Sequence, residues 1–180
     1  MSKNQEAEQM LLRAITLAGG LAGAAAMSQF PEVSQQYVQR LGGAVDELSR
    51  FVTEFNADAA ALGLSREEAL EDLAQGGAMG AKRAETMGRV LARHERLSAD
   101  LSALQAVGPF TRAYRVPHLI DREIASKVWA AYKPAVPLTI EGVAFAGLGF
   151  LGGVAGMGLI LRLLAAPFRR RKPLQAAPAA

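Results

Sequence analysis

The sequence contains no cysteine, which excludes disulfide bonds and thiolate metal ligands. Of its two histidines, His94 lies on the apolar face of a predicted helix without a second metal ligand three or four residues away, and His118 lies in a predicted surface loop. No serine lies in a nucleophile-elbow pattern, and the glycine-rich stretch 147–153 has no lysine to form a phosphate loop. We therefore expect no catalytic residue, no metal site and no cofactor.

The central part of the chain also lacks an excess of charge of either sign. Residues 28–140 carry 13 basic and 14 acidic side chains, and the other seven basic residues lie towards the two ends of the chain. A nucleic-acid-binding face would concentrate the basic surplus on the folded segment. We therefore expect no nucleic-acid partner, and nothing in the sequence indicates a small-molecule substrate.

Charge is missing altogether from Gly142 to Leu161, between Glu141 and Arg162. An α-helix needs about 20 apolar residues to cross the hydrocarbon layer of a bilayer. The mean hydropathy of the chain is +0.13, although 21% of its residues are charged, and this mixture is typical of apolar spans attached to a water-facing segment. We predict a transmembrane helix over residues 142–164.

A second uncharged stretch, residues 14–31, consists mostly of alanine and glycine. We favour a first transmembrane helix that follows a cytoplasmic N-terminus of residues 1–13. A cleaved signal peptide is the second interpretation, because Ala24-Ala25-Ala26 offers a small-x-small cleavage site. A buried helix of a soluble domain is the third. The glutamates ahead of the stretch and its few leucines argue against cleavage.

Small residues at a spacing of four recur in both predicted spans. Such residues let helix backbones approach closely in lipid, where packing drives association. We therefore predict a helix-packing interface on these glycines, although glycine is common in membrane spans in any case. The pairs are Gly19 with Gly23, Gly149 with Gly153, and Gly152 with Gly156.

Basic residues set the predicted orientation of the two spans. Arg169, Arg170, Arg171 and Lys172 follow the second span, and basic residues concentrate on the cytoplasmic side of membranes. We predict a two-pass protein of the bacterial inner (cytoplasmic) membrane with both termini cytoplasmic and residues 32–140 in the periplasm. Residues 165–180 form a basic tail whose end we expect to be disordered.

Two aromatic residues, Trp129 and Tyr132, lie close to the second span in the sequence. Aromatic rings of this type favour the membrane–water interface, so both residues are candidate membrane anchors together with the basic cluster. The alternative is that they pack on the helices of the central segment.

The central segment shows helical periodicity and no alternation typical of strands. A first apolar face runs from Val33 to Leu62 and a second from Met87 to Leu104, with steps of three, four and seven residues. Ser65 and Glu68 form a predicted capping box for a short helix between them. We expect a coiled-coil-like antiparallel helical hairpin, followed by a return helix, whose pairing is guided by an acidic first half and a basic second half.

The fold class predicted from these features is all-α, with two transmembrane helices flanking an extramembrane helical hairpin. The two apolar ends, the phrase SQFPEVSQQYVQRLGGAVDEL at 28–48 and the phrase KPAVPLTIEG at 133–142 resemble an uncharacterised family of proteobacterial inner-membrane proteins. The resemblance covers about residues 10–172. It implies a two-span inner-membrane protein and supplies no activity or functional residue.

The function that these features favour is non-enzymatic. We expect a structural or accessory subunit that packs against itself, as a homo-oligomer, or against a larger membrane protein complex, with membrane lipid as its surroundings. The glycine-rich spans make the contact in lipid and the hairpin makes it outside. The alternative is a homo-oligomeric pore or tension-sensitive channel lined by the small residues of the first span.

Overall fold

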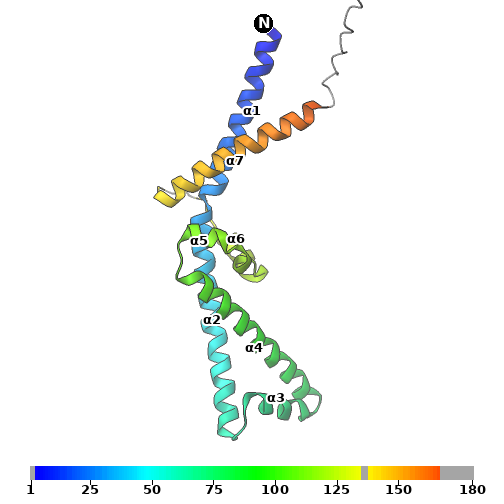
Figure 1. Ribbon diagram of the computed structural model, residues 1–180. Coiled ribbons are helices and arrows are strands. Elements are labelled where there is room, and N and C mark those ends of the chain that lie inside the picture. Colours follow the sequence, from blue (N-terminus) through cyan, green and yellow to red (C-terminus); the bar gives the residue numbers. More distant parts are fainter. Residues whose placement is uncertain (1–2, 135–137, 167–180) are drawn as a thin grey trace, which may run out of the picture. The chain divides into compact units, whose positions relative to one another are not determined.

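The structure is a computed structural model that describes residues 3–134 and 138–166, and this part of the chain contains helices and no strand (Figure 1). The predicted all-α class is confirmed. The elements are α1 Lys3–Ser28, α2 Phe30–Ala61, α3 Arg66–Gln75, α4 Gly77–Gln105, α5 Pro109–Tyr114, the 3-10 helix η1 Val116–Leu119, α6 Arg122–Ala131 and α7 Ile140–Ala165.

The helices belong to two compact units. Unit 1 comprises Met1–Phe30 and Ala135–Ala180 and contains α1 and α7, whereas unit 2 comprises Pro31–Pro134 and contains α2 to α6. The helix is interrupted at Gln29, between α1 and α2, where the backbone N–H of Gln29 bonds to the Ala26 carbonyl at 3.3 Å. Pro31 lies in the first turn of α2, where a missing N–H costs nothing.

Unit 1 contains the two candidate membrane spans. Stretches within Gln5–Ala61, near the N-terminus, and within Ile140–Ala165 are long and apolar enough to cross a bilayer. In the most apolar part of each stretch, only 6% and 11% of the residues are buried, whereas the core helix of a soluble domain is mostly buried. The N-terminus of α7 is capped by Thr139, whose hydroxyl accepts a hydrogen bond from the Gly142 N–H at 3.1 Å.

The core of unit 2 lies where α2, α4 and α6 meet. It is built from one face of each helix, because residues three and four apart share a face. Leu41, Leu97 and Leu104 are fully buried. The buried residues of the core are Tyr37, Val38, Leu41 and Val45 of α2, Leu97 and Leu104 of α4, and Ile124 and Val128 of α6.

The short helix α3 begins as the sequence predicts. The Ser65 hydroxyl accepts a hydrogen bond from the Glu68 N–H at 3.2 Å, and the Glu68 carboxylate accepts one from the Ser65 N–H at 2.7 Å. These two bonds confirm the capping box. Gly63 and Gly77 have φ of 72° and 78°, a conformation that glycine adopts without strain, and they turn the chain on either side of α3.

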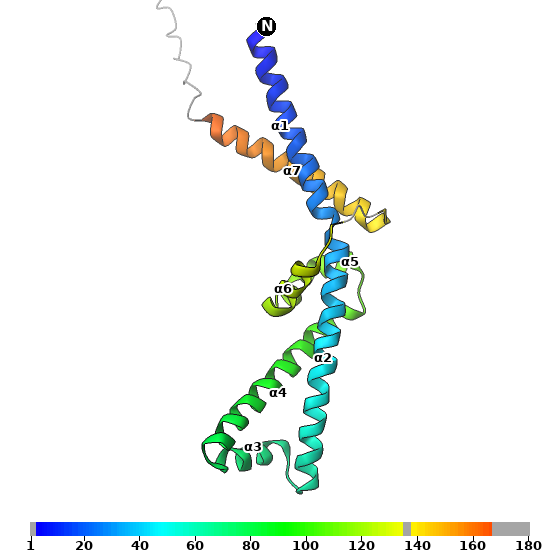
Figure 2. The same ribbon diagram turned by 180° about the vertical axis from the view of Figure 1, so that it is seen from behind.

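The helices α2 and α4 do not pair along their whole length as a coiled coil would. They are close at the core and diverge towards α3, which separates their far ends (Figures 1 and 2). Leu62, which we placed on the hairpin face, is 73% exposed as a result. A Cβ atom on Gly80 would overlap the Leu73 carbonyl, so α3 packs on α4 through backbone contact.

Charge does not join α2 to α4 in the way the sequence suggests. Among the residues that the structure describes, no ion pair connects these two helices. Arg93 and Arg96 of α4 bind instead to Asp121, which immediately precedes α6. The difference arises because the helices diverge and because α6 brings a buried carboxylate to α4.

The buried leucines give a test of this packing. Leu97→Ala should lower the free energy of unfolding of unit 2 by about 2–5 kcal/mol, because it removes a fully buried side chain and leaves a cavity. Denaturant unfolding of the full chain in a mild detergent, followed by circular dichroism, measures the change. Leu62→Ala is the matched control and should change stability by less than about 0.5 kcal/mol, as an exposed site does. Equal effects of both substitutions would contradict the packing described here.

Candidate functional site

The contact between α1 and α7 in unit 1 depends on residues that have no side chain. α1 presents Gly19 and Gly23 to α7, which presents Gly149 and Gly153. A Cβ atom added at Gly23 would overlap the carbonyl oxygen of Gly149, and one added at Gly153 would overlap that of Gly19. The two backbones therefore touch directly, a contact that glycine makes possible in lipid. We call this contact the glycine crossing.

Large side chains pack beside the glycine crossing. A Cβ atom added at Gly20 would lie 2.8 Å from Phe150 Cε2 and 2.7 Å from Val154 Cγ2, so both α7 side chains lie against the α1 backbone. The rings of Phe30 and Phe145 pack with their centroids 5.1 Å apart, and Phe145 is 3% exposed. The crossing is thus a packed core, although it is made by only two helices.

The other two predicted interface glycines, Gly152 and Gly156, lie outside the glycine crossing. A Cβ atom added at either would meet no atom of the described residues within 4 Å, and the same holds for Gly147 and Gly158. We call these four residues the open glycines. The structure thus divides the glycines of α7 into those that hold α1 and those that contact no other helix.

Beyond the crossing, α1 and α7 diverge (Figure 1). An open cleft of about 1020 Å³ is lined by residues of both helices. Most of its lining is apolar, and the open glycine Gly158 is part of it. Glu8, Thr16 and Arg162 line the same cleft. The Thr16 hydroxyl donates a hydrogen bond to the Leu12 carbonyl at 2.8 Å, so its hydrogen-bonding need is met within α1.

In unit 2, Asp121 joins α6 to two other helices. Its carboxylate caps α6 by accepting a hydrogen bond from the Ile124 N–H at 3.1 Å. The same carboxylate accepts hydrogen bonds from Arg96 at 3.1 Å and Arg93 at 3.4 Å, both on α4. The Asp121 N–H donates to the Tyr37 hydroxyl of α2 at 3.0 Å. Only 4% of the Asp121 side chain is exposed, so these donors replace nearly all of its hydration.

The charge of Asp121 is stabilised by this environment. Burial disfavours the carboxylate and by itself raises its pKa, but the Ile124 N–H, the Arg96 hydrogen bond and the nearby positive charges outweigh burial. The pKa of Asp121 therefore lies below that of an ordinary aspartate. Burial raises the pKa of Tyr37 above the ordinary value of a tyrosine.

A second buried charge, Arg112, holds α5 in place. Its Nε donates to the Leu104 carbonyl at the end of α4 at 3.2 Å, and its Nη1 donates to Gln35 Oε1 of α2 at 2.6 Å. Burial lowers the pKa of Arg112, although an arginine remains charged at physiological pH. Asp121 and Arg112 were both missed from the sequence. Aspartate is a preferred N-cap, so the position of Asp121 before α6 could have been recognised in the sequence. No local sequence pattern marks Arg112 as a buried residue.

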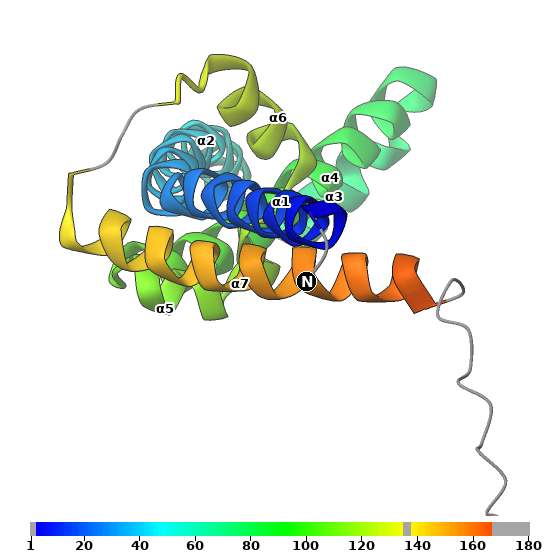
Figure 3. The ribbon, with the colours of Figure 1, turned by 90° about the horizontal axis from the view of Figure 1, so that it is seen from above.

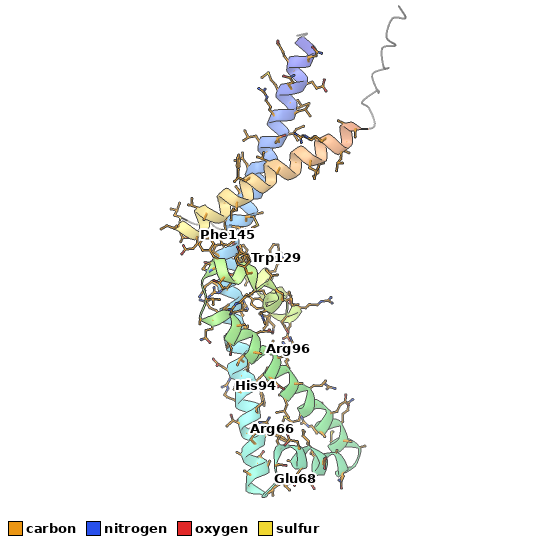
Figure 4. All side chains as sticks on the ribbon, in the orientation of Figure 1. Arg66, Glu68, His94, Arg96, Trp129 and Phe145 are labelled. Carbon is orange, nitrogen blue, oxygen red and sulfur yellow. The ribbon has the colours of Figure 1, made fainter. Side chains whose placement is uncertain are left out.

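Both histidines bind polar side chains of neighbouring elements. His94 Nε2 lies 2.8 Å from Ser49 Oγ and joins α4 to α2 about midway along them (Figure 4). His118 Nδ1 lies 2.7 Å from Asp100 Oδ1, so it ties η1 to α4 and is not the free surface residue that its loop position suggests. In the described parts of the chain, no three His, Asp or Glu side chains are grouped as a metal ion would need.

Near the far end of unit 2, α2, α3 and α4 border an open cleft of about 460 Å³, which we call the hairpin cleft. It lies where α2 and α4 diverge, next to the contact between Ser49 and His94. Phe51, at its edge, is 49% exposed. The lining residues are Leu48, Phe51, Leu73, Arg83, Thr86, Met87 and Val90.

The candidate membrane anchors fall into two groups. The rings of Trp129 and Tyr132 stack with centroids 6.4 Å apart, Tyr132 is half-buried and Trp129 is 75% exposed. Trp129 lies at the end of unit 2 opposite to α3 (Figure 4). The basic cluster of Arg169, Arg170, Arg171 and Lys172 lies outside the described residues.

The chain belongs to the family described as "Protein of unknown function (DUF2937)", whose family model matches residues 11–170. The match covers the whole of unit 2, the whole of the candidate span in α7 and most of α1. No curated protein and no solved structure matches the chain. The resemblance to an uncharacterised family is therefore confirmed, and the function must be argued from the geometry.

The Asp121 junction has a testable effect on stability. Asp121→Asn keeps an oxygen to cap α6 but removes the charge that Arg93 and Arg96 bind. A hydrogen bond between charged groups contributes about 1.5–3 kcal/mol, so we expect a loss of that order at neutral pH. Denaturant unfolding of the full chain in detergent measures it.

The pH dependence follows from the lowered pKa of Asp121. A carboxylate whose folded pKa is depressed adds stability above its unfolded pKa, near 4, and loses this contribution as the pH falls through the folded value. The difference between the wild type and Asp121→Asn should therefore be constant above about pH 5 and shrink below about pH 4. A difference that does not change with pH would show that the carboxylate charge is not the cause.

Proposed function

We propose that this chain is a non-enzymatic, two-pass protein of the bacterial inner membrane that acts as a structural or accessory subunit. It self-associates, or packs on a larger membrane protein complex, through α7 and through the hairpin cleft. The observation that carries the proposal is the set of open glycines on α7, which remain without a neighbour after α1 has packed.

Glycine in the middle of a helix carries a cost. It is less favourable than alanine by about 1 kcal/mol, so several glycines in one helix need a compensating contact. The glycine crossing supplies that contact for Gly149 and Gly153. A further helix packed on Gly152 and Gly156 would supply it for the others, because small residues allow close backbone approach in lipid. Gly158 lies elsewhere on α7, in the lining of the cleft between α1 and α7.

Outside the membrane, the hairpin cleft supports a second contact. Its lining is almost wholly apolar, and α2 and α4 leave it open where they diverge. An exposed apolar surface of this kind is typical of a protein-interaction site. Phe51 at its edge and Met79, which is 75% exposed, extend the apolar surface at this end of unit 2.

The proposed orientation places both termini in the cytoplasm and unit 2 in the periplasm. It is supported by the basic cluster from Arg169 to Lys172, which follows α7 in the sequence. The anchoring role of this cluster rests on its charge, since lysine and arginine near a span end bind the lipid headgroup region.

A pore is the second candidate, and one observation favours it. Glu8, Thr16 and Arg162 supply polar groups to the cleft between α1 and α7, which several copies could bring around one axis. Ion flux through vesicles that contain the purified protein, compared with empty vesicles, distinguishes a pore from an accessory subunit. An assembly that forms without flux excludes the pore.

The open glycines give the decisive test. Gly156→Ile adds a branched side chain where the monomer has room, so it should reduce recovery of the oligomer or complex several-fold and leave the fold of the single chain intact. The native mass of the gently solubilised protein measures assembly. Gly153→Ile should instead separate α1 from α7.

The matched control is Leu148→Ile, which keeps the volume of a 59% exposed side chain and should change neither property. If Gly156→Ile and Leu148→Ile give the same yield of assembly, lipid tails alone cover the open glycines. The proposed contact through α7 would then be wrong.

Topology is tested separately. Reporter fusions after residue 172 should be active only in the cytoplasm, and fusions near residue 78, between α3 and α4, only in the periplasm. Mass spectrometry of the mature chain distinguishes an uncleaved first span from a signal peptide, since cleavage after Ala26 would yield a chain that begins at Met27. A cytoplasmic reporter at residue 78 would overturn the arrangement.

A further inference from the structure

Unit 2 exposes its large apolar side chains unevenly. Five of the eight such residues that the structure describes in unit 2 lie within residues 109–134, the segment of α5, η1 and α6. Tyr114 is 89% exposed, Trp129 75%, Ile120 66% and Val116 47%. Exposed apolar side chains that concentrate in one segment indicate an interaction surface. We call these four residues the apolar collar.

The three elements that carry the apolar collar lie at one end of unit 2. α5 and α6 flank the first part of α2, at the end of unit 2 opposite to α3 (Figures 1 and 3). They are fixed there by the core residues Ile124 and Val128 and by the buried side chains of Asp121 and Arg112. The residues of the apolar collar therefore lie on the outer surface of a segment that is fixed to α2 and α4 by packing and hydrogen bonds.

Both connections of unit 2 to the predicted spans leave from this same end. Pro31 follows Ser28, the last residue of α1, after two residues. α6 ends at Ala131 and α7 begins at Ile140, and the eight residues between them can extend over at most about 28 Å. If α1 and α7 cross a bilayer, the chain holds the end with the apolar collar close to the lipid headgroups.

The charge of the segment suits a lipid surface. Residues 109–134 carry five basic and two acidic side chains. Both acids are engaged, Asp121 with Arg93 and Arg96, and Glu123 with Arg93 and Lys127. Arg122, the first residue of α6, and Lys133, which follows the end of α6, are exposed. Aromatic rings combined with basic side chains in one segment are typical of chains that lie in the interface of anionic bilayers.

We infer that α5, η1 and α6 form a docking surface for the lipid bilayer, with the apolar collar in the headgroup layer and Arg122 and Lys133 on anionic headgroups. The inference rests on the two spans of the proposed function and adds a second, peripheral attachment. In this inference the buried side chains of Asp121 and Arg112 hold α5 and α6 in the position that exposes the apolar collar to the bilayer.

The chain offers a direct probe, because Trp129 is its one tryptophan. The full-length protein is inserted into vesicles of phosphatidylcholine, alone or mixed with phosphatidylglycerol, with bromine at shallow or deep acyl positions. Trp129 fluorescence should be quenched several-fold more by shallow than by deep bromines. Phosphatidylglycerol should increase the quenching, and salt should reverse the increase. Arg122→Gln with Lys133→Gln should remove the lipid selectivity while Trp129 stays folded against Tyr132.

The matched control moves the tryptophan to the other end of unit 2. Trp129→Phe with Phe51→Trp places it at the hairpin cleft, far along α2, where bromine should not quench it. Protease protection of the same vesicles shows whether the spans are inserted. Inserted protein whose Trp129 is quenched no more than this control overturns the docking surface and leaves the proposed function standing. Failure of insertion itself overturns the proposed function.

Discussion

The position of the return helix α6 depends on one buried carboxylate. A ten-residue helix is not stable alone in water, so α6 must be held by other parts of the chain. The Asp121 carboxylate caps α6 and binds two arginines of α4. The backbone N–H of Asp121 donates a hydrogen bond to the Tyr37 hydroxyl of α2. A buried charge without its partners is costly, so the three helices cannot separate here without exposing it. This junction brings the chain back to the end of unit 2 where it entered.

In unit 1 the corresponding constraint is the absence of side chains. A Cβ atom added at Gly23, Gly149 or Gly153 would overlap a backbone carbonyl of the facing helix, and one added at Gly19 would overlap the Met157 side chain. Such contact holds two helices with little apolar area, which suits lipid, where burying apolar surface gains nothing. The two units thus use opposite means, a buried charge in unit 2 and bare backbone in unit 1, to join segments that are far apart in the sequence.

Much of the fold could be predicted from local signals. The helical period, the capping box of Ser65 and Glu68, and the stop at Gly63 each act within a few residues, so they are legible in the sequence. The divergence of α2 and α4 was not predictable, because it depends on how α3 packs on α4. The partners of Asp121 and Arg112 lie up to 84 and 77 residues away, and no local pattern encodes such pairs.

Unit 2 is tightly packed at one end and loosely packed at the other. Around Asp121, the leucine core and two engaged arginines fix α2, α4 and α6 together. Beyond the contact between Ser49 and His94, the same two long helices have an open apolar cleft between them. Regions with few buried apolar contacts open at a lower free-energy cost than the core. The end of unit 2 that carries α3 should therefore open more readily than the end that is held by Asp121 and the leucine core.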